Sequence, residues 1–264
     1  MINSYEFWKR RVKKRLKKQL KKQTDLVCNT DIILSNLEFD QIFKNIKKKK
    51  YSLLELGCGN GLFLKKIINL NFLKKYIGID FVDEIIRECK FKFKYKNLTF
   101  KTLDLRLINK KTFAEEFDYI ISKKTIQSIL NHNSQCRVID NAGFFLKKNG
   151  FMILVESSKK GLKNINLIRK KFKLSNITPP IHNLFLDDEK IKNYNYKNIK
   201  LIRIENFSSG FYFVSRIIYA LYSNIFLKKP TKYEHPLNII ASKIHYNLLN
   251  HDFSQVKTYI FKKI

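Results

Sequence analysis

Apolar positions follow two different patterns along this chain. Near the start, Trp8, Val12, Leu16 and Leu20 recur every four residues and leave lysines between them, which predicts an amphipathic basic helix. From residue 51 onward, short apolar runs alternate with segments of helical spacing. Strands that alternate with helices form parallel βαβ units with right-handed crossovers. The second pattern therefore predicts an α/β fold.

The apolar runs also predict individual elements. In the first part of the fold we expect strands at 51–56, 76–79, 98–103, 117–122 and 150–156, separated by helices at 61–70, 84–95 and 134–146. The remainder is less regular, with expected helices at 164–172 and 211–221 and expected strands at 199–206 and 256–264. The last of these strands is expected to close one edge of the sheet.

Composition narrows the class of protein. Hydrophobic residues make up 44% of the 264 positions, which is enough for a substantial core. No uninterrupted run of about 18 apolar residues occurs and the charged N-terminus lacks an apolar stretch, so neither a membrane span nor a secretory signal is expected. The cysteines lack the paired spacing of a zinc site or a disulfide framework and favour a cytoplasmic protein without a metal; they are Cys28, Cys58, Cys89 and Cys136.

Charge is the strongest compositional signal. The formal net charge is +31, and only nine of the 53 cationic residues are arginines. An AT-rich genome favours lysine codons, which is one source of the lysine excess. The lysines are interpreted either as a solvated surface or as a surface for an acidic partner. Residues 1–23 hold ten cationic residues against Glu6. This helix is predicted to contact an acidic membrane surface or RNA, with docking on the main domain as the alternative.

A glycine-rich loop follows the first predicted strand. It reads Gly57-Cys58-Gly59-Asn60-Gly61, and glycines let a backbone turn tightly and approach a ligand closely. Asp80 ends the second predicted strand, 23 residues after Gly57. A carboxylate there can accept hydrogen bonds from both hydroxyls of a ribose. These features predict a nucleotide site, and the alternative for Asp80 is a helix cap.

The amino-acid sequence of this loop and of the strand before it resembles a known family. Residues 53–61, Leu-Leu-Glu-Leu-Gly-Cys-Gly-Asn-Gly, resemble motif I of class I S-adenosylmethionine-dependent methyltransferases, and the GxGxxG of dehydrogenases is absent. The likeness continues in the family's order through 76–80, 103–105, 117–121 and 146–150. It implies a Rossmann-like, mostly parallel sheet with a C-terminal antiparallel edge strand, and S-adenosyl-L-methionine as the cofactor.

The resemblance also implies roles for particular residues. Glu55 would orient the loop or meet the cofactor's amino group, Asp80 would hold the ribose hydroxyls, Phe81 would cover the adenine, and Asp104 would accept from the adenine amino group. A loop or capping role is the alternative for Asp104. The implied cofactor site comprises Glu55, Gly57, Cys58, Gly59, Gly61, Asp80, Phe81, Asp104 and Leu105.

The pattern of the chain and this resemblance together suggest a division of the chain. Residues 1–48 would form an N-terminal basic helical segment, and residues 49–264 the methyltransferase domain. Within that domain we expect a cofactor-binding core at 50–156, an acceptor-side cap at 157–250 and a closing strand at 251–264.

The acceptor has to be inferred from the later segments. Ser122-Lys123-Lys124-Thr125 follows the fourth strand, so the Asn/Asp-Pro-Pro-Tyr/Phe motif for exocyclic amines is absent. The C-terminal part, including His182-Asn183 and His235-Pro236, resembles uncharacterised bacterial methyltransferases encoded among surface-polysaccharide and small-molecule modification genes. A tryptophan commonly precedes the His-Asn pair in that group, and here it is Ile181.

Candidate acceptor residues follow from their chemistry. His182 and His235 are candidate general bases because a neutral imidazole titrates near working pH. Arg169 and Arg216 are candidates to hold an anionic group. Glu156 and Tyr212 complete the expected acceptor-binding set. Since ligands of open parallel sheets lie at the carboxyl ends of the strands, we expect the histidines and arginines to gather there, opposite the glycine loop.

The leading hypothesis is a methyltransferase acting on a hydroxyl or carboxylate of a small molecule or glycan precursor. One alternative is an RNA methyltransferase that uses the lysine-rich surface. The other is a non-catalytic binding protein with the cofactor fold. The expected location is the cytoplasm, with the first helix able to hold the protein at the membrane periphery.

Overall fold

The computed structural model describes residues 4–19, 31–47, 50–68, 72–244 and 252–264. Expectations for Leu20 and Cys28 lie outside these residues.

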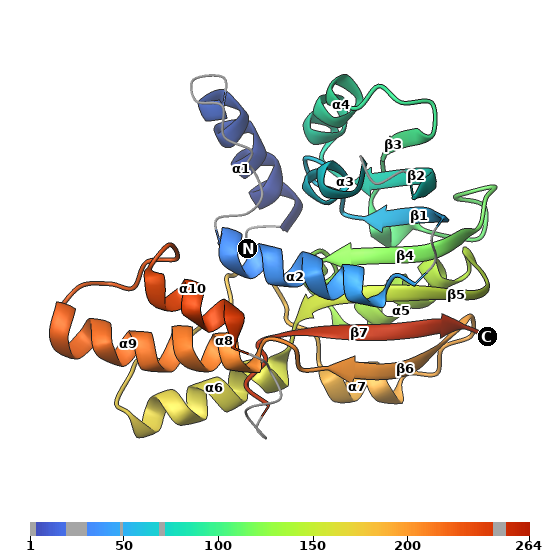
Figure 1. The fold of residues 1–264 in the computed structure, drawn as a ribbon. Coiled ribbons are helices and arrows are strands. Elements are labelled where there is room, and N and C mark those ends of the chain that lie inside the picture. The colour runs from blue at the N-terminus through green and yellow to red at the C-terminus, as the bar shows by residue number, and fades with distance from the viewer. Residues whose placement is uncertain (1–3, 20–30, 48–49, 69–71, 245–251) are drawn as a thin grey trace.

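The centre of the molecule is a seven-stranded sheet in the order β3-β2-β1-β4-β5-β7-β6 (Figure 1). Neighbouring strands from β1 to β5 are parallel, and β7 runs antiparallel to β5 and to β6. The strands are β1 Tyr51–Leu56, β2 Leu73–Asp80, β3 Leu98–Thr102, β4 Phe117–Lys123, β5 Leu146–Ser157, β6 Ile199–Glu205 and β7 Val256–Lys263. The predicted fold class is confirmed. One detail is corrected, because β7 lies between β5 and β6 and the outer strand is β6.

Helices cover both faces of the sheet (Figure 1). The predicted helices after β1, β2, β4 and β5 are confirmed as α3, α4, α5 and α6, whereas α2, α7 and α10 were not predicted. The helices are α1 Ser4–Gln19, α2 Ile32–Asn45, α3 Leu62–Ile67, α4 Asp83–Lys92, α5 His132–Gly143, α6 Lys159–Lys171, α7 Asp188–Asn193, α8 Ser209–Phe213, α9 Tyr219–Tyr222 and α10 Pro236–Lys243.

Each face of the sheet packs against its own layer. Leu53 of β1 belongs to a core cluster with Phe39 of α2 and Phe63 of α3. Its neighbour Leu54 belongs to a second cluster with Ile139 of α5, because successive side chains of a strand point to opposite faces. All six residues of β1 are buried, which explains why apolar residues occupy both faces of this strand, as Leu53 and Leu54 do.

The N-terminal helix docks on the domain. Val12 of α1 is only 1% exposed and joins the core cluster that contains Leu53. Lys13 forms an ion pair with Glu84 of α4 at 3.4 Å. The docking alternative is therefore what the structure shows, and contact of this helix with membranes or RNA stays a prediction.

The segment after β6 extends away from the sheet (Figure 1). It runs through α8, a π-helical turn at Val214–Ile218, α9 and a second π-helical turn at Ser223–Leu227. By length and composition, Ser209–Leu227 is the one described helix able to cross a membrane, and 39% of its apolar stretch is buried in the protein. We call the unit from Ser209 to Lys243, which includes α10, the helical hairpin.

Candidate functional site

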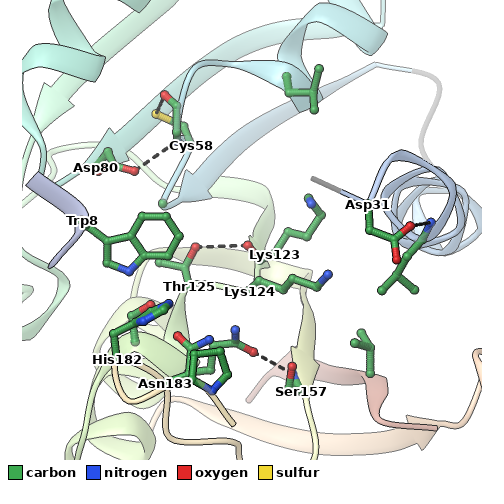
Figure 2. A pocket seen from close by; sticks show the side chains of 18 of the residues that line it. Trp8, Asp31, Cys58, Asp80, Lys123, Lys124, Thr125, Ser157, His182 and Asn183 are labelled. Carbon is green, nitrogen blue, oxygen red and sulfur yellow. Dashed lines mark hydrogen bonds between the residues drawn. The ribbon is translucent and has the colours of Figure 1, made fainter. Parts of the chain in front are cut away.

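A cavity of about 440 Å³ opens at the carboxyl ends of the parallel strands. Asp80 ends β2, Lys123 ends β4 and Ser157 ends β5, and all three side chains line it. In Figure 2, Asp80 and Cys58 lie on one side of the Trp8 ring, with His182 and Asn183 on the other. The cavity is of the size that small-molecule ligands occupy.

The glycine loop forms one wall of this cavity through its backbone. Gly57 and Gly59 have φ angles of +74° and +52°, which side chains disfavour. A Cβ atom on Gly57 would lie 2.1 Å from Oγ1 of Thr125, so only glycine fits at this position. The N–H groups of Gly57 and Cys58 donate to the carbonyl oxygen of Ile79 at 2.8 and 2.9 Å. The loop is thereby fixed to the end of β2.

Asp80 is held at the base of the loop. One carboxylate oxygen accepts from the Gly59 N–H at 3.1 Å, and the other accepts from the Val82 N–H at 3.0 Å. Each oxygen retains a lone pair, and the residue lines the cavity. Burial raises the pKa of Asp80, while the backbone donors counteract that rise. The geometry fits a group that offers two neighbouring hydroxyls.

Glu55 lies beneath the loop and is buried. It accepts a hydrogen bond from the hydroxyl of Tyr76 at 2.5 Å. Burial raises the pKa of Glu55 to about 8, and the Tyr76 bond and the nearby Lys123 limit that rise. A cationic group bound in the cavity would favour the ionised carboxylate.

Some of the expected cofactor residues lie elsewhere. Cys58 and Phe81 line the cavity, but among the described lining residues neither Asp104 nor Leu105 appears. Asp104 instead caps a short 3₁₀ turn and forms an ion pair with Arg106 at 2.5 Å. Leu105 is buried in the core beneath the sheet. Gly61 precedes α3 as its N-cap, outside the main cavity. For Asp104 the capping alternative is the one observed.

His182 is placed on the opposite wall. Its side chain lies against α1, where its ring stacks on Phe7 with centroids 3.6 Å apart and meets Trp8 edge-on at 5.4 Å. Burial, followed by the charge of Arg11, lowers the pKa of His182. The imidazole is thus kept neutral at a pH where it can accept a proton.

Arg216 and Tyr212 line the same half of the cavity. The Arg216 guanidinium lies 5.6 Å from the ring centre of Tyr212 and 5.7 Å from that of Tyr233. It also pairs with Asp31, the cap of α2, at 3.3 Å. Rings on two sides and one carboxylate define where this guanidinium points.

Two other expected acceptor residues do not reach the cavity. Arg169 donates to the carbonyl oxygen of Ser175 at 2.7 Å and to that of Arg216. Its guanidinium therefore supports the backbone of Arg216. His235 caps α10 and stacks on Tyr219 with centroids 4.1 Å apart. The expectation that all four basic residues line one pocket is corrected: His182 and Arg216 do.

Glu156 is also corrected, from acceptor contact to loop support. It is fully buried and accepts from the hydroxyl of Ser122 at 2.8 Å. The backbone N–H groups of Thr125, Ile126 and Gln127 donate to the same carboxylate at 2.9 to 3.3 Å. These four donors use the acceptor capacity of Glu156, so it holds the segment after β4 in place.

The sequence reasoning missed a charged cluster in the cavity wall. Lys123 and Lys124 follow one another, and both pair with the buried carboxylate of Glu38 on α2, at 3.1 and 2.5 Å. Lys124 has a φ of +54°, a conformation that costs energy outside glycine and gathers at functional sites. Trp8 and Arg11 of α1 line the cavity as well. The lysine pair at the end of β4 was visible in the sequence, whereas nothing in the sequence pointed to Glu38.

Comparison with known proteins agrees with this geometry. The profile of a methyltransferase domain matches residues 47–199. A malonyl-[acyl-carrier protein] O-methyltransferase from Ilyobacter polytropus is 34% identical over 116 residues, which are 42% of this chain and 41% of that protein. A tRNA (guanine-N(7)-)-methyltransferase from Clostridium botulinum is 36% identical over 74 residues, 25% of this chain and 32% of that protein. The chain thus spans less than half the length of these relatives.

Solved structures show the same fold. The N-methyltransferase NodS from Bradyrhizobium japonicum, in complex with S-adenosyl-L-homocysteine, superposes with a TM-score of 0.57. The superposition covers 99% of each chain at 11% sequence identity. At this identity the likeness describes the arrangement of strands and helices.

Proposed function

Since the chain belongs to the methyltransferase-domain family, whose members use S-adenosyl-L-methionine, we propose that it methylates an oxygen of an anionic small molecule or glycan precursor. The observation that carries the proposal is the single cavity that joins two chemically different walls. Residues 57–60 of the glycine loop and Asp80 form one wall, and His182 and Arg216 the other. Because the cavity has both a cofactor wall and an acceptor wall, the alternative of a non-catalytic protein is not favoured.

The first wall suits the cofactor. Asp80 offers two oxygens to a ribose diol. Gly57 and Gly59 line the cavity and carry no side chain that would occupy it. Phe81 and Val82 present an apolar surface. Bound S-adenosyl-L-methionine would supply an electrophilic methyl group on its sulfonium. Glu55 would be drawn toward its ionised form by the cofactor's ammonium group.

The second wall favours a negatively charged acceptor. Arg11, Lys123, Lys124 and Arg216 are the cationic side chains among the described lining residues. Asp31 in the wall and Glu38 behind it offset two of these charges. The remaining positive charge would attract a carboxylate or a phosphate.

His182 would take the proton of an acceptor hydroxyl as the oxygen–methyl bond forms. Its lowered pKa keeps it unprotonated for this role. Arg216 would hold the anionic group and so bring the attacking oxygen into line. Trp8 and Phe81, which line the two halves, would exclude water. An acceptor carboxylate is already ionised and would need no base.

The deciding experiment is transfer from isotopically labelled cofactor to fractionated cell extracts. Nucleotide sugars, acidic metabolites, lipids and RNA are offered separately, and labelled products are identified by mass spectrometry. We expect label in a hydroxyl or carboxylate of an acidic small molecule or glycan precursor. Label confined to RNA would replace this proposal with the RNA alternative.

A variant pair then tests the anion contact. Arg216→Gln is expected to raise KM for the acceptor roughly tenfold or more, because hydrogen bonds to charged groups contribute the most. Arg203→Gln is the matched control, since Arg203 forms an ion pair with Glu205 on β6, away from the cavity. Equal KM values in the two variants would remove Arg216 from the acceptor site.

A further inference from the structure

The helical hairpin carries an apolar stripe that its own domain does not cover. Ile218, Tyr222, Ile225 and Phe226 succeed one another on the segment Ser209–Leu227, and each side chain is exposed. Phe226 is the most exposed of them, at 71%, and its ring lies 5.6 Å from that of Tyr222. Neighbouring exposed aromatic and aliphatic side chains of this kind mark an interaction surface.

Cationic side chains follow the stripe directly. The helix ends at Lys228, whose φ of +48° turns the chain out of the helix. Lys228, Lys229 and Lys232 are all exposed. Residues 206–233 contain no aspartate or glutamate. The apolar stripe therefore has a purely cationic border at this end.

We propose that the helical hairpin docks on an anionic lipid bilayer, with the stripe in the headgroup–acyl boundary and the lysines on the phosphates. An apolar helix face with a lysine border is the pattern of interfacial helices. Tyr222 and Tyr233 add exposed aromatic rings with a polar tip, which suit the membrane–water boundary.

Charge distinguishes a bilayer from other occupants. A second copy of the chain packed symmetrically on the stripe would bring Lys228, Lys229 and Lys232 close to their equivalents, which repel. RNA would satisfy the lysines and leave Ile225 and Phe226 without apolar contacts. An anionic bilayer satisfies both the apolar and the cationic groups.

The docking surface and part of the acceptor wall belong to the same unit, the helical hairpin. Tyr212, Arg216 and Tyr233 of the same hairpin line the acceptor half. The bilayer contact thus lies on the unit that builds the acceptor wall. It is also separate from α1, whose Trp8 and Val12 face inward and line the cavity.

Binding of the 264-residue chain to vesicles tests the proposal. Vesicles of phosphatidylcholine alone are compared with vesicles of equal parts phosphatidylcholine and phosphatidylglycerol. A net charge of +31 attracts anionic vesicles whichever face is used, so the decisive measurement is a matched pair of variants. Phe226 and Phe91 are 71% and 75% exposed, and Phe91 lies on α4.

We expect Phe226→Ser to weaken binding to the anionic vesicles about tenfold, because a phenylalanine side chain no longer enters the bilayer. Phe91→Ser should bind like the unchanged protein. The double variant Lys228→Gln/Lys229→Gln should lose about 30-fold on anionic vesicles, and the control Lys110→Gln/Lys111→Gln, changed at exposed lysines elsewhere, much less.

Three results would overturn the proposal. The first is equal loss of binding in Phe226→Ser and Phe91→Ser. The second is binding of the unchanged protein to neutral and anionic vesicles with the same affinity. The third is a dimer in analytical ultracentrifugation that Phe226→Ser converts to monomer, which would assign the stripe to a second copy of the chain.

Discussion

The two halves of the cavity are built by different means. The cofactor half is made by the ends of the adjacent strands β1 and β2, and its fixed groups are largely backbone N–H groups around Gly57, Gly59 and Asp80. The acceptor half is made by side chains from α1, from α2, from the segment after β4, from the loop that carries His182 and from the helical hairpin. A common cofactor can be bound by a short local motif, whereas acceptor specificity depends on distant segments that meet only after folding.

Among the variants that test the two halves of the cavity, replacement of His182 should have the largest effect. His182→Ala is expected to lower kcat about 100-fold for a hydroxyl acceptor, because a positioned base is lost. His235→Ala should leave kcat nearly unchanged, since His235 stacks on Tyr219 outside the cavity. Steady-state kinetics over a range of pH check both variants. Because the pKa of His182 is lowered, the acid limb of the profile should lie below that of an ordinary histidine.

Two aspartate variants test the cofactor half of the cavity. Asp80→Ala is expected to weaken S-adenosyl-L-homocysteine binding by roughly 10- to 100-fold, since hydrogen bonds to a charged acceptor are lost. Asp104→Ala should bind normally, because Asp104 pairs with Arg106 away from the cavity. Calorimetric titration measures both. Normal binding by the Asp80 variant would mean that the ribose is held elsewhere.

A variant in α1 tests whether cofactor binding and acceptor binding are independent of each other. Trp8 lines the cavity and contacts His182, so Trp8→Ala is expected to weaken both cofactor and acceptor binding about tenfold through lost apolar contact. Lys14→Ala, a change at an exposed position of the same helix, is the control. A change in acceptor KM alone would place α1 entirely in the acceptor half.

The smallest expected effect is a pH dependence of cofactor binding. The pKa of Glu55 is raised from 4.5 to about 8 in the protein without ligand, so the folded state holds a proton that an unfolded chain releases above pH 4.5. A bound ammonium favours the ionised form, and cofactor affinity should therefore rise as pH increases toward 8. Between pH 7 and pH 8 we expect about a fivefold gain.

The matched variant for this effect is Glu55→Gln. It cannot ionise, so its cofactor affinity should be constant across the same pH range. Calorimetry in buffers of different ionisation enthalpy should also detect proton release on binding by the unchanged protein below pH 8. A flat affinity profile in the unchanged protein would show that Glu55 does not meet the ammonium group.

The features that the sequence predicted correctly are local ones. β1 and β4 are central strands buried on both faces, so apolar residues occupy both of their faces. The glycine loop directly follows β1 and Asp80 ends β2, and the parallel sheet brings them together. Directly before the strand expected at 150–156, Asn149 has a φ of +64° and the pairing of β5 with β4 is irregular. These elements need little information from distant residues.

The features that were missed depend on distant partners. Glu38 lies on a helix that the pattern did not predict, and its role is visible only where Lys123 and Lys124 meet it. Glu156 could have faced the acceptor, but the Ser122 hydroxyl in β4 and three backbone N–H groups after β4 donate to its carboxylate. Asp104 follows a strand as Asp80 does, and Arg106 two residues later captures it. Sequence position alone does not distinguish these carboxylates.

The π-helical turn at Val214–Ile218 changes the directions of the side chains beyond it. A π turn holds about one residue more than an α turn, which rotates the following residues by about 100°. Phe211, Ser215, Ile218 and Tyr222 have the spacing of a single face of a regular helix. Yet Phe211 and Ser215 are 2% and 1% exposed, whereas Ile218 and Tyr222 are 43% and 40% exposed. A helical wheel would merge these two faces, and one additional residue is enough to turn the second half of a core helix outward.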